Sequence, residues 1–233
     1  MQGNTVHPTA VVGDHVRMGV GNTIGPYAVV VGCVELGDNN WIGPFVSIGT
    51  PAQMRGGPHP AWNSHTSHGI RIGSNNVIRE HATIHEGTKK TTFVGDSCYF
   101  MTGSHIPHDA IIEDEVTLAN SVHLGGHSWI GKGANLGLGV QVHQRSALGA
   151  GVMIGMNSTV TRHIPPFALA VGSPARIRSA NTRGLERLEV APDVITAIDR
   201  HYRNGATGPP TTDLLDLNPH LDAFLLHAAG SHA

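Results

Sequence analysis

An apolar side chain recurs at every sixth position from Val94 to Val160, and no step of this series misses. The positions four residues after these carry small or β-branched side chains, including Cys98. An α-helix has a period of about 3.6 residues and an ordinary strand a period of about 2, so neither explains the repeat. A fixed period of six is typical of a parallel β-helix, in which three flat sides make one coil of about 18 residues. We therefore expect a stacked prism whose aliphatic core includes Cys98.

The six-residue step also runs over residues 6–48 and 72–84, so the prism begins near the N-terminus. It is interrupted at about 54–69, where Pro, Gly and His are frequent, and at 87–92, which contains two lysines. Gly and Pro favour turns, and we expect both stretches to be loops that leave the prism. The first loop could bind a ligand or pack against another subunit. An ordinary β-sandwich would instead repeat at about eight to twelve residues.

The pattern changes after Val160. Pro165 and Pro166 cannot donate to a β-ladder, so they indicate the end of the prism. We predict a β-helix domain over residues 1–178 and a small helical subdomain over 179–233. Apolar residues at helical spacing predict short helices over 184–190, 192–203 and within 211–230.

Composition makes some functions improbable. Charged residues make up 14% of the chain and the net charge is −2, so there is no electrostatic reason to expect nucleic acid or an anionic membrane as a partner. The two cysteines, Cys33 and Cys98, form neither a disulfide framework nor a CxxC motif. The N-terminus lacks the basic and apolar regions of a secretory signal, and no apolar run approaches the length of a membrane span. We expect a cytoplasmic protein.

The 17 histidines are the compositional hint of chemistry. Five of them avoid the inward positions of the six-residue frame and should project outward: His105, His108, His123, His127 and His143. A spacing of one coil stacks His105 on His123 and brings His108 and Asp109 near His127. Imidazole titrates near neutral pH, which suits a general base. Because a flat prism side has no cleft, we expect a concave site between neighbouring subunits of a cyclic oligomer.

The ordered motifs MTGSHIPHD, LANSVHLGGH, VHQ and IPPF, with IREHATIHEGT upstream and NTRGLERL downstream, run from about Ile42 to Leu188. This series resembles the UDP-N-acetylglucosamine O-acyltransferases of lipid A biosynthesis. The resemblance implies an all-β left-handed parallel β-helix that assembles as a homotrimer. It also implies acyl transfer from an acyl carrier protein or CoA thioester to a hydroxyl or amine of a small acceptor, here a UDP-linked amino sugar. It implies no cofactor beyond the thioester co-substrate and no metal.

The same resemblance implies roles for individual residues. His108 would be the general base, Asp109 would orient its imidazole, and the Gly126 N–H would stabilise the oxyanion. The implied substrate-binding residues are His105, His127, His143, Gln144, Asn181 and Arg187. Asn181 and Arg187 would contact the nucleotide, and Arg suits a diphosphate.

Some positions depart from the family's pattern. Met156 stands where the family limits acyl-chain length, often with Gly, so we expect a shorter acyl group. Arg183 stands where the family tends to have an acidic residue near the nucleotide, and the first loop lacks the usual acidic and basic pair. The segment GSPARI (172–177) resembles the end of the prism in acetyl-CoA-dependent acetyltransferases.

Three other functions remain open on the sequence. A γ-class carbonic anhydrase would bind zinc through three histidines from two subunits. A non-catalytic scaffold would bind a carrier protein without thioester turnover. An enzyme of specialised metabolism would keep the acyl-transfer chemistry and use a small alcohol or amine as acceptor.

Overall fold

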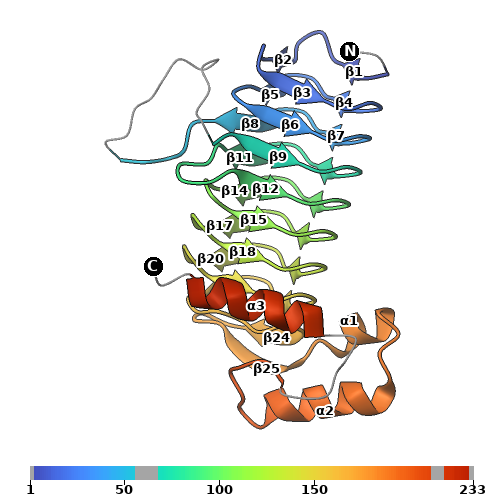
Figure 1. Ribbon diagram of the computed structural model, residues 1–233, viewed down its shortest axis with the longest axis vertical. Coiled ribbons are helices and arrows are strands. Elements are labelled where there is room, and N and C mark those ends of the chain that lie inside the picture. The colour runs from blue at the N-terminus through green and yellow to red at the C-terminus, as the bar shows by residue number, and fades with distance from the viewer. Residues whose placement is uncertain (1–2, 56–67, 211–217, 231–233) are drawn as a thin grey trace.

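The computed structural model describes residues 3–55, 68–210 and 218–230. The described chain winds into a three-sided prism whose coils stack along the long axis of the molecule (Figure 1). Each side of the prism is one sheet, and we name the three sheets A, B and C. All strand pairs are parallel apart from the last pair of sheet A. The predicted fold class is therefore confirmed: a parallel β-helix built from hexapeptide repeats, with short helices at its C-terminal end.

The strands are mostly two or three residues long, because each hexapeptide spends its other residues on a corner. Sheet A contains β1 (Thr5–Val6), β4 (Thr23–Ile24), β7 (Trp41–Ile42), β10 (Val77–Ile78), β13 (Tyr99–Phe100), β16 (Thr117–Leu118), β19 (Asn135–Leu136), β22 (Met153–Ile154), β24 (Ala168–Val171) and β25 (Arg176–Ala180). Sheet B contains β2 (Val11–Val12), β5 (Val29–Val30), β8 (Ser47–Thr50), β11 (Thr83–His85), β14 (His105–Ile106), β17 (His123–Leu124), β20 (Gln141–Val142) and β23 (Thr159–Val160). Sheet C contains β3 (Val16–Met18), β6 (Val34–Leu36), β9 (Ile70–Ile72), β12 (Thr92–Val94), β15 (Ile111–Ile112), β18 (Trp129–Ile130) and β21 (Ala147–Leu148).

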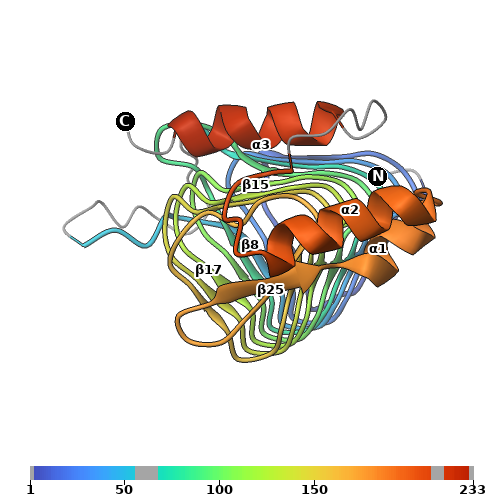
Figure 2. The ribbon, with the colours of Figure 1, turned by 90° about the horizontal axis from the view of Figure 1, so that it is seen from below.

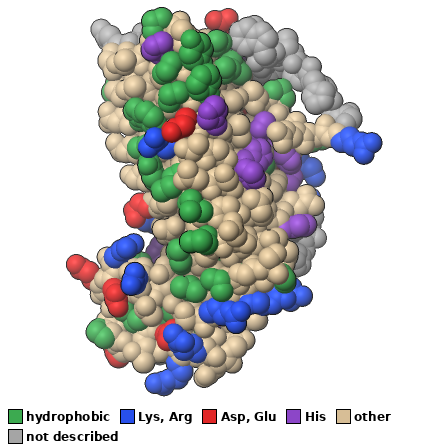
Figure 3. All heavy atoms as spheres, turned by 180° about the vertical axis from the view of Figure 1, so that it is seen from behind, with side chains coloured by type: hydrophobic (Ala, Val, Ile, Leu, Met, Phe, Trp, Pro, Cys, Tyr) green, Lys and Arg blue, Asp and Glu red, His purple; other side chains and the backbone are tan. Residues whose placement is uncertain are grey.

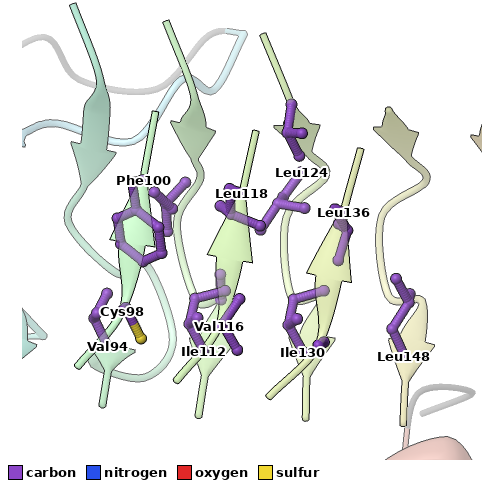
Figure 4. Close-up of a cluster of buried hydrophobic side chains, with 14 of the residues drawn as sticks. Val94, Cys98, Phe100, Ile112, Val116, Leu118, Leu124, Ile130, Leu136 and Leu148 are labelled. Atoms are coloured by element: carbon purple, nitrogen blue, oxygen red, sulfur yellow. The ribbon is translucent and has the colours of Figure 1, made fainter. Parts of the chain in front are cut away.

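The core follows the six-residue frame. Every sixth residue from Val94 to Val160 is at most 5% exposed, and the intervening small positions are buried as well (Figure 4). Cys98 lies among them at 1% exposure, as predicted. Stacking of one coil on the next removes these aliphatic side chains from water, and this burial is the main stabilising term of such a repeat.

The strands on either side of the two interruptions still pair in the same alignment, although more residues lie between them. Thr23 pairs with Trp41, one coil later, but Trp41 pairs with Val77 and Val77 with Tyr99. The longer steps accommodate the extra residues between β8 and β9 and between β11 and β12. Most of the loop predicted at 54–69 lies outside the described residues.

A ladder of buried asparagines fixes this register from inside. The Asn40 side chain donates to Asn22 Oδ1 over 3.0 Å, and its own Oδ1 accepts from the Asn76 N–H over 2.9 Å. The Asn76 Oδ1 then accepts from the Cys98 N–H over 2.7 Å. Each buried amide therefore has the partner that its burial requires.

Sheet A continues beyond the two prolines at 165 and 166. Strand β24 follows them and pairs in parallel with β22, and β25 folds back antiparallel onto β24. The prolines lie in the corner before β24, where their missing N–H groups cost no ladder hydrogen bond. The expectation that the ladder stops at them is therefore wrong for this sheet.

Three helices follow the strands within the described residues: α1 (Thr182–Arg187), α2 (Pro192–Arg203) and α3 (Asn218–Gly230). Pro192 lies at the start of α2, where its fixed backbone angle favours helix initiation. Helix α2 packs on β25 and α1 lies beside it, whereas α3 lies across sheet C (Figure 2). The stretches that form helices here are too short or too polar to cross a bilayer.

Candidate active site

The predicted histidines gather along the edge where sheet B turns into sheet C. We call this the BC edge; its corner segments follow β11, β14, β17 and β20. Figure 3 shows His side chains clustered on this side of the prism. Because successive coils repeat the same turn, residues one coil apart occupy the same place on the edge. Asp109 and His127, for example, both have φ 60° at equivalent corner positions.

His108 and Asp109 form a hydrogen-bonded pair at the centre of the edge. The His108 Nδ1–H donates to Asp109 Oδ2 over 2.7 Å, which leaves Nε2 with its lone pair. The His108 side chain is 19% exposed, whereas that of Asp109 is fully buried. An imidazole oriented by a buried carboxylate is the arrangement that a general base requires.

The carboxylate of Asp109 is held by the loop between β11 and β12. The backbone N–H groups of Thr88, Lys89 and Lys90 all donate to it, and the Thr88 hydroxyl donates to Oδ2 over 2.5 Å. Three successive amides around one anion form a backbone nest. Burial alone would raise the pKa of Asp109, but the hydrogen bonds from Thr88, His108 and the lysine amides outweigh it and hold this pKa below its ordinary value. Asp109 is therefore a carboxylate at any pH at which an enzyme would work.

Gly126 lies directly against the imidazole of His108. A methyl group at Gly126 would be 2.7 Å from His108 Cε1 and 2.8 Å from Nε2, so a side chain there would collide with the ring. No described residue accepts a hydrogen bond from the Gly126 N–H. The base nitrogen therefore lies against the residue whose N–H has no described acceptor, and acyl transfer needs such a proton acceptor and oxyanion donor close together.

His127 completes this group from the next coil. Its ring centroid is 5.1 Å from that of His108, and its Nε2 is 3.7 Å from Asp109 Oδ2. Burial lowers the pKa of His127, and the nearby Asp109 carboxylate only partly opposes this. His127 is thus a mainly neutral donor or acceptor next to the base.

A second column of imidazoles runs beside the pair. His105 pairs in register with His123, and their ring centroids are 6.2 Å apart. On the other side, the His85 ring lies 5.2 Å from that of His105. Burial, together with the neighbouring His85 and His123, lowers the pKa of His105 to about 4. His105 therefore offers a neutral ring to a ligand at neutral pH.

His143 and Gln144 extend the edge by one more coil and are both exposed. The His143 Nδ1–H donates to the Gln144 carbonyl oxygen over 3.0 Å. Gly125 packs against the backbone between them, with no room for a side chain. The structure thus brings seven of the ten predicted site residues to one edge: His105, His108, Asp109, Gly126, His127, His143 and Gln144.

Asn181 and Arg187 lie elsewhere. They line a cavity of about 650 Å³ between α1 and the outer face of sheet A, at the edge where sheet C turns into sheet A. Asn181 caps α1: its Oδ1 accepts from the Gly184 N–H and its side-chain N–H donates to the Gly151 carbonyl. Met156 is on the third edge, between β22 and β23, and is 67% exposed. Within one subunit these three residues do not meet the histidines.

His108, Asp109 and His127 are also the described group whose spacing could suit a metal ion, with ligand atoms within 4.8 Å of one another. Asp109, however, already accepts hydrogen bonds from five donor groups on described residues. A metal would have to displace the His108 hydrogen bond that orients the base. The donor set therefore fits an acid–base pair better than a metal centre.

Two residues at this edge were missed by sequence reasoning. His85 is 7% exposed and Thr88 holds Asp109, yet neither was assigned a role. The motif IREHATIHEGT covers residues 78–88 and so contains both His85 and Thr88, and it was the available signal. No periodicity could place Thr88, because its loop lies outside the repeat.

Comparison with known proteins places this geometry in context. Residues 164–207 match the family described as UDP-N-acetylglucosamine O-acyltransferase, domain 2. Acyl-acyl-carrier-protein–UDP-N-acetylglucosamine O-acyltransferase from Synechocystis sp. is 37% identical over 136 residues, which are 58% of this chain and 49% of that protein. The protein of the same name from Pseudomonas putida is 37% identical over 164 residues, which are 66% of this chain and 64% of that protein. The chain spans about half the length of the curated relatives that it matches.

Solved structures agree over a larger share of the chain. UDP-N-acetylglucosamine acyltransferase from Campylobacter jejuni superposes with a TM-score of 0.72 at 28% identity and covers 87% of this chain and 82% of its own. The Arabidopsis enzyme of that name gives a TM-score of 0.70 at 25% identity and covers 99% and 94%. The family model, the curated sequences and the solved folds thus confirm that this chain, as its HIPHD and GGH motifs predict, resembles the UDP-N-acetylglucosamine O-acyltransferases.

Proposed function

We propose that this protein is an acyltransferase that moves an acyl group from a thioester to a hydroxyl or amine of a UDP-linked amino sugar. One observation carries the proposal: His108, fixed by a buried carboxylate through Nδ1, lies against Gly126, whose N–H has no acceptor among the described residues. The names of the relatives support the choice of acyl carrier protein as donor and UDP-N-acetylglucosamine as acceptor.

In the proposed reaction, the acceptor O–H or N–H attacks the thioester carbonyl carbon while His108 Nε2 takes its proton. The carbonyl oxygen becomes an oxyanion that the Gly126 N–H stabilises. When this intermediate collapses, the new ester or amide bond remains and the C–S bond breaks. The departing sulfur takes the proton back from His108 and leaves as a thiol. Asp109 stays ionised throughout and stabilises the imidazolium that forms transiently.

A homotrimer is part of the proposal. The residues assigned to the acceptor lie on two edges of the prism: His105 and His108 on the BC edge, Arg187 in the cavity beside α1. A cyclic arrangement of prisms would bring the BC edge of one subunit toward the cavity of its neighbour. The site would then be concave only in the assembly.

The proposal also covers the remaining expectations about donor, cofactor and location. CoA thioesters carry the same reactive group as an acyl carrier protein and remain a possible donor, as the GSPARI segment suggests. The chemistry outlined above needs no metal or redox cofactor. A cytoplasmic location follows from the use of intracellular thioesters.

A different acceptor is the second candidate, because of the charges in the cavity. Arg183 and Arg187 both line it, four residues apart on α1, and neither has an ion-pair partner among the described residues. The other cations of its wall are paired: Lys132 with Glu115 and Arg203 with Asp199. Like charges four residues apart on a helix repel each other, and an anionic ligand would relieve this. A small acceptor carrying a phosphate or carboxylate would therefore also suit the cavity.

The test is thiol release from acyl carrier protein and CoA thioesters of graded chain length, with UDP-N-acetylglucosamine as acceptor. We expect turnover with a preference for shorter chains, and a loss of about 10²- to 10⁴-fold in the His108→Ala variant. Turnover that survives in this variant would remove His108 as the base. Folded protein that releases no thiol with any donor would remove this acceptor and favour the second candidate.

A further inference from the structure

His85 is a buried histidine that the mechanism above does not use. It ends β11, and its ring is packed between the chain at Thr50 and Pro51 and the ring of His105. Its exposure is 7%, which is low for a side chain with two polar atoms. It therefore forms the wall of the histidine cluster at the end nearest to the first loop.

One nitrogen of His85 is satisfied and the other is not. The Nδ1–H donates to the Pro51 carbonyl oxygen over 2.9 Å, and Thr50 Oγ1 is 3.2 Å away. This hydrogen bond fixes the tautomer, so Nε2 carries a lone pair and no proton. Nε2 is buried and has no hydrogen-bond partner among the described residues. A buried polar atom without a partner is costly, and such atoms are uncommon in folded proteins.

The surroundings of His85 keep this lone pair available. Burial lowers the pKa of His85, and the neighbouring His108 lowers it further, so the ring stays neutral. Because Nδ1 faces the Pro51 carbonyl, Nε2 faces away from it. The His105 ring on that side is only half-buried and belongs to the proposed acceptor site. A ligand bound against His105 is therefore the nearest source of the missing donor.

We propose that His85 is a further substrate-binding residue, whose Nε2 accepts a hydrogen bond from an N–H or O–H group of the UDP-amino-sugar acceptor. An unprotonated imidazole nitrogen selects a hydrogen-bond donor and disfavours a phosphate or carboxylate oxygen at this point. The inference rests on the proposed function, because it takes the acceptor to lie between His105 and His108.

The test compares three variants at position 85. Asparagine can keep the hydrogen bond to Pro51 through its side-chain N–H, but it has no atom where Nε2 was. Glutamine can bring an amide oxygen to that place, and phenylalanine keeps the ring shape without either nitrogen. We expect His85→Asn to raise KM for UDP-N-acetylglucosamine roughly five- to tenfold with kcat within about twofold. The reason is that the lost hydrogen bond would stabilise the bound acceptor and the transition state equally. We expect His85→Gln to recover part of this loss and His85→Phe to recover none.

A matched control is Ser104→Ala. The Ser104 hydroxyl is also buried without a described partner, but Ser104 is an inward core position of the prism. This variant should leave KM unchanged, because its orphaned atom faces the core.

A second readout is the ¹⁵N resonance of His85 Nε2, assigned from the spectrum of His85→Asn. It should move when UDP-N-acetylglucosamine is added to the wild-type protein, because the lone pair becomes hydrogen-bonded. Wild-type turnover with an unchanged KM in His85→Asn, or with an unmoved resonance, would overturn the role of His85 and leave the proposed function standing. Absence of wild-type turnover with this acceptor would overturn both.

Discussion

At the scale of single residues, the imidazole of His108 packs closely against Gly126 at the centre of the BC edge. His108 can be pinned by Asp109 and still keep Nε2 open only because Gly126 leaves room beside it. The six-residue frame predicts that both residues are in corners. It could not predict that one touches the other, because that contact depends on the tilt of the imidazole, which Asp109 and its loop determine.

The Gly126→Ala substitution tests this fit. The added methyl would lie under 3 Å from the His108 ring, so the imidazole must turn away from Asp109 or the corner must shift. We expect kcat to fall by about 10²- to 10³-fold, the usual effect of a disturbed oxyanion donor. Gly208→Ala is the control, because a methyl at Gly208 would meet no atom within 4 Å. Steady-state kinetics with equal activity in the Gly126 variant and the control would contradict the fit.

The stability of the fold should depend on pH through His105. Its pKa is lowered to about 4 in the folded chain, whereas an unfolded histidine has a pKa of about 6.5. Between these values the unfolded state binds more protons than the folded state, so the stabilising contribution is complete above about pH 6.5 and is lost as pH falls toward 4. We expect the melting temperature to decline over this window, and less steeply in His105→Gln than in the wild type.

The control for this window is His7→Gln, which alters an exposed histidine of the first coil. Its melting curve should decline with pH as the wild type does. Parallel declines in all three proteins would mean that His105 does not carry the effect.

At the scale of elements, the loop between β11 and β12 holds the carboxylate of Asp109 in place. Its three backbone amides and the Thr88 hydroxyl enclose Asp109, which follows β14 in the next coil. The break in the repeat indicates that a loop exists here, but loop conformation follows no period. This is why the strands and the inward residues could be predicted from the sequence. The conformation of the loop, the contact of Thr88 with Asp109 and the burial of His85 could not.

Thr88→Val removes the hydroxyl and keeps the shape of the side chain. Asp109 Oδ2, which also accepts from His108, would then lose the Thr88 hydroxyl as a donor, and the imidazole would be held less firmly. We expect kcat to fall about tenfold with KM nearly unchanged, because a positioning group acts in the transition state. Thr88→Ser should restore most of the rate. Thr91→Val, on the exposed side of the same loop, should have no effect; an equal loss in both valine variants would indicate a general disturbance of the loop.

At the scale of the whole molecule, the sequence predicts the prism and a site between subunits, but not that Arg187 lies on a different edge from the histidines. The histidines and the arginine cavity lie on different edges of one chain, at positions that the repeat fixes independently. Neither edge alone encloses a substrate in the way that a typical small-molecule site does. The trimer proposed above would enclose a substrate between the histidine edge of one subunit and the cavity of the next.

Subunit complementation tests the division of the site. His108→Ala and Arg187→Ala should each be poorly active alone, and each should have a mass three times the 24.5 kDa of one chain by sedimentation. When the two are co-expressed, random mixing in a trimer should restore roughly a quarter of the interfaces, with an intact histidine edge from one subunit facing an intact cavity from the next. Mixed samples no more active than either variant would mean that both residues serve the same subunit, or that Arg187 is not part of the site.

The unequal register steps have a consequence for how such a protein can diversify. Extra residues enter between β8 and β9 and between β11 and β12, yet the asparagine ladder and the stacked coils resume in the same alignment on the far side. Loops of different lengths can therefore be inserted between coils, because the length of a loop does not change the position of the next coil. The loops can therefore change in sequence and length while the coils keep His108 in position. An acyltransferase of this fold could in this way change its acceptor and retain the same general base.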